Sequence, residues 1–95
     1  YGGEEFACIL PDTSFEDAMG LARDLERKVR ECAIVHENST VAPVVTISIG
    51  VATRDGNTDG DAPELIGLAD HQLYQAKHSG RGCVCGEVLV ARKAA

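Results

Sequence analysis

Two glycines followed by two glutamates, near the start of the chain, have the clearest potential for chemistry. Gly2 and Gly3 permit backbone angles closed to other residues, so the chain can turn there and lie close to a bulky anion. Glu4 and Glu5 follow directly, and two carboxylates can hold Mg²⁺ beside such an anion. In the alternative, the turn is exposed and its glutamates only face water. For an isolated stretch of this kind, the alternative is favoured.

A group of basic residues lies far along the chain, where a helix is expected to end. Lys77 and Arg81 are four residues apart, a spacing that places two side chains on one side of a helix. His78 stands beside Lys77, and Gly80 is a natural end for the helix. Cations at this position can simply complement the helix dipole. They can also clamp an anion, if a suitable site faces them.

The composition restricts the class of partner. The chain has 95 residues, which fits one small domain, with 9 basic against 15 acidic residues and a net charge of −6. This balance argues against binding a nucleic-acid polymer and against direct contact with an anionic membrane, since both require a surplus of positive charge. A small anionic ligand held by a few cations and a metal stays compatible. No apolar run is long enough to cross a membrane and no secretory signal opens the chain, so a cytoplasmic location is expected.

The four cysteines are Cys8, Cys32, Cys83 and Cys85. Without a secretory signal, we expect reduced and mostly buried thiols. Residues two apart on a strand point to one face, so a metal or redox role for Cys83 and Cys85 is geometrically conceivable. A structural role is favoured over it, because the chain lacks the further cysteine and histidine spacing of a zinc site.

Apolar patterning in the first half predicts a strand, a helix and a second strand. Phe6–Leu10 is a continuous apolar run, suited to a strand buried on both faces. Ser14 stands three residues before Asp17, which is typical of a helix N-cap. The apolar residues that follow at helical spacing are Ala18, Ala22, Leu25, Val29 and Cys32. Val44–Val51 alternates β-branched with small residues, which predicts a strand with one face open to close packing.

The second half predicts a loop, a helix and a last strand. Residues 55–60 superficially resemble a calcium loop, but the carboxylate spacing is wrong and a solvated loop is expected. Asp61 can cap a helix that continues to Gly80. A strand is expected from Cys83 to about Val90, and residues 88–95 are expected to form a frayed tail.

Three segments together resemble the GGDEF family, the diguanylate cyclases. Tyr1–Phe6 reads Y-G-G-E-E-F, a form of the family's signature hairpin, and Thr46–Ala52 resembles its T-x-S-x-G-x-A strand. Ala69–Arg81 resembles its A-D-x-A-L-Y-x-A-K-x-x-G-R segment, with Gln72 in place of the usual alanine. Gly82 stands where asparagine often follows. Three motifs in the right order make the resemblance specific, and it covers most of the chain.

The resemblance implies a reaction in which two GTP molecules condense to cyclic di-GMP and pyrophosphate. Two GGDEF domains, each with one GTP, would face each other across a two-fold axis. Two Mg²⁺ ions per active site, or Mn²⁺, would be held by Glu4 and Glu5, and Glu4 would help to deprotonate the attacking hydroxyl.

The resemblance also assigns the residues that bind substrate. Gly2 and Gly3 would let the nucleotide approach the hairpin, while Lys77 and Arg81 would contact the triphosphate. Asp70 and Tyr74 would serve positioning rather than chemistry, although they belong to the same segment as Lys77. The catalytic and metal-binding residues would be Glu4 and Glu5.

The implied fold is α+β: a partial ferredoxin-like, nucleotidyl-cyclase-palm-like fragment of β-α-β-α-β type. Residues 1–95 would form the C-terminal part of one GGDEF domain, with residues 1–6 as the signature hairpin. The half before the signature would carry the central first strand, a metal-binding aspartate and the contacts to guanine. The fragment by itself is therefore expected to be inactive, and the intact parent domain to be an enzyme.

The missing central strand has a structural consequence. In the implied fold that strand lies between Phe6–Leu10 and Val44–Val51, so its absence leaves open sheet edges. We expect these two segments to pair directly in parallel, or a second copy of the chain to fill the gap.

Two further functional expectations follow from the resemblance. An upstream sensory or receiver domain is expected in the parent protein, which could also be anchored to a membrane through upstream segments. As an alternative function, the chain could belong to a catalytically silent GGDEF module that binds GTP or a partner domain. This alternative ranks lower because the signature carboxylates are retained.

Overall fold

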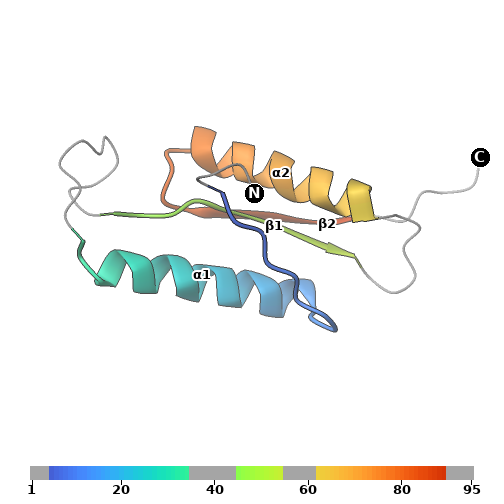
Figure 1. Cartoon of the computed structure of the whole chain (residues 1–95), viewed down its shortest axis with the longest axis horizontal. Coiled ribbons are helices and arrows are strands. Elements are labelled where there is room, and N and C mark those ends of the chain that lie inside the picture. The colour runs from blue at the N-terminus through green and yellow to red at the C-terminus, as the bar shows by residue number, and fades with distance from the viewer. Residues whose placement is uncertain (1–4, 35–44, 55–61, 90–95) are drawn as a thin grey trace, which may run out of the picture.

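A computed structural model describes residues 5–34, 45–54 and 62–89 of the chain. In chain order the elements are helix α1 (Phe15–Glu31), strand β1 (Ile49–Arg54), helix α2 (Ala62–His78) and strand β2 (Val84–Leu89). The two strands lie side by side between the helices, so that α2 covers one face of the sheet and α1 the other (Figure 1). The result is a small α+β arrangement, in agreement with the partial fold that the sequence implies.

The two strands pair in parallel, from Ile49 opposite Val84 to Arg54 opposite Leu89. Parallel neighbours cannot be joined by a tight turn, because the chain has to return to the end where the first strand began. Helix α2 makes this return and packs on both strands. The β1-α2-β2 unit thereby fixes where the last turn of α2 lies relative to the sheet.

Local sequence explains the start of α1, as predicted. Ser14 has extended backbone angles, and its side-chain oxygen accepts a hydrogen bond of 3.1 Å from the backbone N–H of Asp17. This bond satisfies one of the free N–H groups in the first turn. Acidic residues occupy that first turn and basic residues the last, which complements the helix dipole.

The buried face of α1 agrees with the predicted face at Ala18 and Ala22 and differs from it elsewhere. Ala18, Met19, Ala22 and Glu26 are buried, whereas Leu25 is 51% exposed and Cys32 is exposed. The prediction followed apolar residue types at helical spacing. The contact surface follows instead the side of the helix that meets the sheet, and that side includes a glutamate.

The strand predicted at Val44–Val51 is displaced toward the C-terminus. β1 begins at Ile49 and continues to Arg54, while residues 45–48 belong to no strand and Val44 lies outside the described residues. The backbone N–H of Ile49 donates a 3.0 Å hydrogen bond to the carbonyl of Cys83, immediately before β2. Pairing therefore starts where β2 offers a partner, although the β-branched pattern of the sequence begins earlier.

The strand predicted at Phe6–Leu10 is wrong within this structure. These residues have no regular secondary structure, and Phe6 is 93% and Ile9 88% exposed. A strand requires a neighbouring backbone for its hydrogen bonds, and β1 and β2 pair with each other. The direct pairing of Phe6–Leu10 with Val44–Val51 is therefore not observed among the described residues. Filling of the gap by a second copy stays a prediction.

Two glycines allow the helices to lie close to the sheet. A Cβ atom added at Gly50 in β1 would overlap the backbone of Leu73 and Ala69 in α2. A Cβ atom at Gly86 in β2 would overlap the side chain of Met19 in α1. The prediction that small residues on one strand face permit close packing is confirmed at Gly50.

The apolar core of the described residues is small. Its buried members are Ala18, Met19, Ala22 and Ala76, and large apolar side chains elsewhere stay partly exposed. Cys8 and Cys32 are exposed and Cys83 and Cys85 half-buried, so the expected burial of the thiols is wrong for the first two. All four are free of disulfide bonds, as expected. Within the described ranges, no helix has the length and apolar character needed to cross a membrane.

Both ends of the chain lie in part outside the described residues. Val88 and Leu89 belong to β2 rather than to the expected frayed tail, whose remainder from residue 90 onward is not described. Residues 1–4 of the predicted hairpin and the loop at residues 55–60 likewise fall outside the described ranges.

Candidate functional site

An ion pair joins the two charged groups that the sequence singles out. The Nζ atom of Lys77 lies 3.0 Å from Oε2 of Glu5, although the two residues are 72 positions apart in the chain. Both side chains are about one-third exposed, at 33% and 34%. Residues 5–14 run from the α2 side of the molecule to the start of α1 (Figure 1), and this pair ties their first residue to the last turn of α2. The structure thus brings a signature carboxylate and a predicted substrate-binding cation together.

A shallow, open pocket of about 250 Å³ surrounds this pair. Its lining consists of Glu5 and of four α2 residues on one helical face: Asp70, Leu73, Tyr74 and Lys77. Spacings of three and four along a helix place side chains on one face, which explains why this part of α2 forms one wall. Asp70 and Tyr74, predicted to have a positioning role, therefore border the same space as Lys77.

Arg81 lies apart from this pocket. The prediction placed it on the same helix side as Lys77, but α2 ends at His78, so helical spacing no longer applies. Gly80, Arg81 and Gly82 all have positive φ angles, of 108°, 63° and 56°. Gly80 ends the helical path as predicted, and Arg81, which is exposed, continues the chain with left-handed backbone angles beyond the helix.

Hydrogen bonds hold the turn that contains Arg81. Its backbone N–H donates to the carbonyl of Ala76 at 3.1 Å. The next N–H, of Gly82, donates to Oγ of Ser48 at 3.0 Å, just before β1. The turn is thus attached to both α2 and the approach to the sheet, which fixes the backbone from which the Arg81 side chain extends.

The third basic residue, His78, is engaged with its own helix. Its ring stacks on that of Tyr74, with centroids 3.8 Å apart and planes at 23°. Its Nδ1 atom lies 2.9 Å from the carbonyl oxygen of Tyr74. His78 therefore supports Tyr74, which borders the pocket, and is not among the residues that line it.

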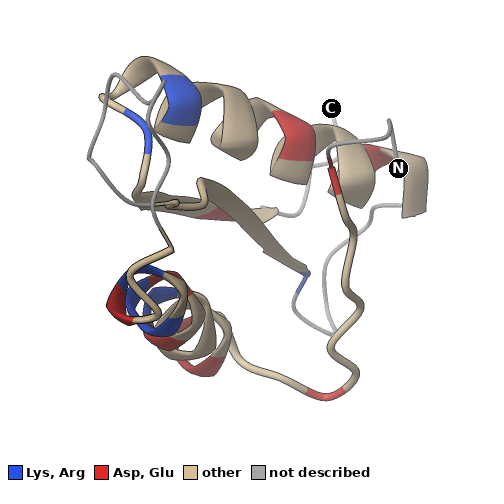
Figure 2. Cartoon of the chain, turned by 60° about the vertical axis from the view of Figure 1, so that its left-hand side comes forward, with Lys and Arg blue, Asp and Glu red and all other residues tan. Residues whose placement is uncertain are grey.

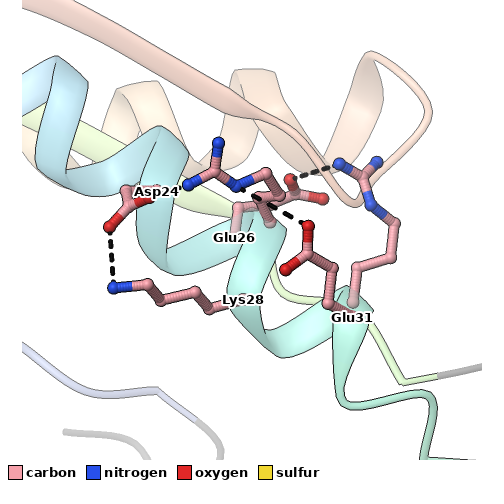
Figure 3. Close-up of polar contacts among 6 residues, drawn as sticks. Asp24, Glu26, Lys28 and Glu31 are labelled. Carbon is pink, nitrogen blue, oxygen red and sulfur yellow. Dashed lines mark hydrogen bonds and ion pairs between the residues drawn. The ribbon is translucent and has the colours of Figure 1, made fainter.

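Within the described part of the chain, charge gathers most densely on α1, on the other side of the sheet (Figure 2). Asp24 pairs with Lys28 at 3.0 Å and also with Arg27, and Arg27 lies 3.8 Å from Glu31 (Figure 3). The hydrogen bond from Lys28 is the main cause that lowers the pKa of Asp24. These side chains are exposed and spaced for one helix surface, so they support the helix and the solubility of the domain.

Glu26 is a buried charge that the sequence did not single out. Its side chain is 8% exposed, and its Oε2 atom pairs with Nη2 of Arg30 at 3.2 Å (Figure 3). Its Oε1 atom has no hydrogen-bond partner within the described part of the chain. In the sequence, Arg30 stands four residues after Glu26, which indicates a possible ion pair. Glutamate–arginine pairs at this spacing are common on exposed helix surfaces, so the spacing does not indicate burial.

Comparison with known proteins decides the family. The family model described as "Diguanylate cyclase, GGDEF domain" matches residues 1–83. The chain belongs to the GGDEF family. The match contains Glu5, Lys77 and Arg81, and also Gly2, Gly3 and Glu4, which lie outside the described residues.

Individual relatives agree with this assignment. The chain is 43% identical over 88 residues to "Response regulator PleD" of Caulobacter vibrioides, covering 92% of this chain and 19% of the relative. It is 37% identical over 84 residues to "Diguanylate cyclase A" of Treponema denticola, covering 88% and 22%. "Diguanylate cyclase DgcM" of Escherichia coli is 39% identical over 84 residues, covering 88% and 19%. The chain thus spans about a fifth of the length of these curated relatives.

The GGDEF family resemblance predicted Mg²⁺, and the donor chemistry near the pocket is compatible with it. Glu5 supplies carboxylate oxygen, the hard ligand that Mg²⁺ prefers, and the Lys77 ammonium group lies beside it. Among the described residues, no group of three or more potential ligands gathers in one place. Mg²⁺ commonly takes one or two carboxylates and completes its shell with water and substrate phosphate, so such a small protein ligand set suffices.

Proposed function

We propose that this chain supplies part of the GTP site of a diguanylate cyclase domain, which condenses two GTP molecules into cyclic di-GMP and pyrophosphate. The contact between Glu5 and Lys77 carries the proposal, because it joins the signature motif to the A-D-x-x-L-Y-x-A-K segment across 72 residues. Membership of the GGDEF family and the names of the relatives support the same reaction.

Lys77 can bind a phosphate without leaving Glu5. An ammonium group has three donors, and among the described residues Lys77 makes one such contact, the 3.0 Å contact to Glu5. The remaining donors can point into the pocket toward an oxygen of the triphosphate. Glu5 then holds the cation in place before substrate arrives, which reduces the conformational entropy lost on binding.

Arg81 would act from outside the pocket wall. Its backbone is fixed by the bonds to Ala76 and Ser48, and a long guanidinium side chain can reach a phosphate oxygen from there. Gly2 and Gly3 would let the backbone of the hairpin lie against the nucleotide. Together these groups would orient the triphosphate so that its α-phosphate faces the second GTP.

Glu4 and Glu5 would hold Mg²⁺, or Mn²⁺, which neutralises charge on the phosphates during transfer. The 3′-hydroxyl of one GTP would attack the α-phosphate of the other, and pyrophosphate would leave. Glu4 would assist by accepting the hydroxyl proton. Asp70 and Tyr74 would shape the pocket wall, as their place in its lining supports.

The reaction requires two such domains in a two-fold arrangement, each with one GTP. We propose that the 95 residues alone are inactive, because the GGDEF resemblance assigns the guanine contacts and one metal ligand to the preceding half of the domain. The chain's coverage of about a fifth of its relatives is compatible with an upstream regulatory domain in the parent, as in a response regulator. A cytoplasmic location suits a GTP-consuming reaction.

GTP binding by the whole protein that carries these residues tests the role of Lys77. With Lys77→Ala we expect the dissociation constant for GTP in the presence of Mg²⁺ to rise at least about tenfold, since a charge-assisted contact is worth about 1.5–3 kcal/mol. The matched control is Lys28→Ala, which removes an exposed lysine from α1 on the other side of the sheet. Calorimetry measures both. Equal affinities for the two variants would contradict the proposal.

Binding and turnover separate the two candidate functions. Tight GTP binding with no cyclic di-GMP formed would indicate the silent module rather than the enzyme. Formation of the product, lost on substitution of the signature carboxylates, would indicate the enzyme.

A further inference from the structure

Cys83 lies immediately before β2 and Cys85 within it, and contacts place both on the α2 side of the sheet. The Sγ atom of Cys83 donates a hydrogen bond of 3.3 Å to the carbonyl of Ala76 in α2. Cys85 is the register partner of Gly50, the strand residue that lies directly under the α2 backbone. Both thiols are half-buried, so they sit at the boundary between sheet and helix and stay reachable from solvent.

The two thiols influence each other. Burial raises the pKa of the Cys83 thiol, and the neighbouring Cys85 raises it further, with a smaller effect from the charge of Glu26. Two thiolates side by side would repel, whereas a cation between them would convert this repulsion into attraction. The pair is thus a poor site for a free thiolate but a suitable one for a thiophilic cation.

The strand spacing favours a bridging ion over a disulfide. The carbonyl of Cys83 accepts a hydrogen bond from Ile49 as that of a strand residue would, although β2 itself begins at Val84. Two extended residues advance about 6.6 Å, and side chains that stand parallel keep about that separation at Cβ. A disulfide needs Cβ atoms only about 3.5–4.5 Å apart. A cation bound linearly, with metal–sulfur bonds near the zinc–thiolate length of about 2.3 Å, places the two sulfurs about 4.6 Å apart. Both side chains can reach that separation by leaning toward each other.

The ligand count selects the kind of cation. No group of three or more potential ligands occurs among the described residues, so a tetrahedral zinc site does not fit there. Two soft sulfur ligands suit a soft monovalent cation. We propose that Cys83 and Cys85 form a two-thiolate site for a cation of the Cu(I) and Ag(I) class. On binding, two S–H bonds break, two metal–sulfur bonds form, and two protons pass to solvent.

Binding of a cation to this dithiol site (Cys83 and Cys85) would change the hydrogen bonding of the turn that carries Arg81. The carbonyl of Ala76 accepts hydrogen bonds from both the Cys83 thiol and the Arg81 N–H, at 3.3 and 3.1 Å. Loss of the thiol proton to the cation removes the first of these bonds. The carbonyl then accepts from the Arg81 N–H without the thiol, so the environment of the Arg81 amide changes.

Titration with Ag⁺ tests the site, in a Cys8→Ser/Cys32→Ser background. Those two cysteines are exposed and would otherwise take up the cation independently. We expect one tightly bound Ag⁺ per chain, and at least about a hundredfold loss of affinity when either Cys83→Ser or Cys85→Ser is added. In the amide NMR spectrum, the Arg81 resonance should shift on binding and stay in place in both variants.

Two results would overturn the proposal. One is that Cys83→Ser or Cys85→Ser keeps the full affinity for Ag⁺, since this would mean that each thiol binds alone. The other is saturation at two Ag⁺ per chain. Circular dichroism of each variant, and the same titration with Cys83→Ala and Cys85→Ala, separates loss of the site from loss of the fold.

Discussion

The contact between Glu5 and Lys77 supports a shared role for two residues whose individual roles are ambiguous in the sequence. The sequence predicted both as site residues, but each also had a plain alternative, an exposed hairpin and a helix-dipole cation. Their contact at 3.0 Å could not be predicted from local patterns. It depends on the path of residues 5–14, which run from the α2 side of the molecule to the start of α1 (Figure 1). Arg81 was misplaced for a related reason, since helical spacing was applied beyond the last helical residue, His78.

Glu26 and Arg30 allow a direct test of a buried charge. We expect Arg30→Met to lower the free energy of unfolding by about 1–3 kcal/mol, because the Glu26 carboxylate, 8% exposed, would lose its ion-pair partner. Adding Glu26→Met to that variant should recover the loss, since apolar replacement of a whole buried pair is often neutral or stabilising. Urea unfolding followed by circular dichroism gives both values.

The exposed glutamate Glu31 provides the control for that pair. Glu31→Met removes an exposed partner of Arg27 and should change stability by no more than about 0.5 kcal/mol. If Arg30→Met changed the free energy of unfolding as little as Glu31→Met does, the Glu26 carboxylate would not be a buried, unpaired charge in the Arg30→Met variant.

At the scale of elements, helices were predicted better than strands. The N-cap at Ser14 and the helix end at Gly80 follow from side-chain and backbone chemistry within a few residues, and both are confirmed. Strand limits depend on a partner elsewhere in the chain. β1 therefore starts at Ile49, opposite β2, and not at Val44 where the β-branched pattern begins. Phe6–Leu10 has the composition of a buried strand, yet has no partner strand among the described residues.

Close packing of α2 on β1 predicts opposite effects for two glycine substitutions. Gly50→Ala should lower the free energy of unfolding by about 1–3 kcal/mol, because the new methyl group meets backbone atoms of Leu73 and Ala69 that cannot rotate aside. Gly67→Ala, in open space on α2, should raise it by about 0.5–1 kcal/mol through helix propensity. Urea unfolding of both variants measures the difference. Equal effects would show that α2 does not lie against Gly50.

At the scale of the whole molecule, the described residues leave much apolar surface uncovered. The sheet has two strands, and Phe6 and Ile9 are 93% and 88% exposed. Two-stranded sheets are marginal on their own, and open edges accept further strands. The chain spans about a fifth of the length of the curated relatives it matches, and its being one part of a larger GGDEF domain stays a prediction.

We therefore expect the 95-residue chain to self-associate at high concentration. Sedimentation velocity should show a weight-average mass that rises with concentration, and Phe6→Asp/Ile9→Asp should return the chain toward the monomer mass of 10.1 kDa. As a control, Leu21→Asp changes an apolar residue that is 52% exposed on α1 and should leave association unchanged. A chain that stays monomeric at every concentration would contradict this prediction.

Formation of cyclic di-GMP from GTP and Mg²⁺ tests the central claim most directly. The assay compares the whole protein that carries these residues, its Glu4→Gln variant and the 95-residue chain alone. We predict product from the whole protein, a loss of at least about a hundredfold in rate with Glu4→Gln, and none from the isolated chain, because the proposed site is shared between two halves of the domain. Unchanged turnover with Glu4→Gln, or product from the isolated chain, would contradict the account.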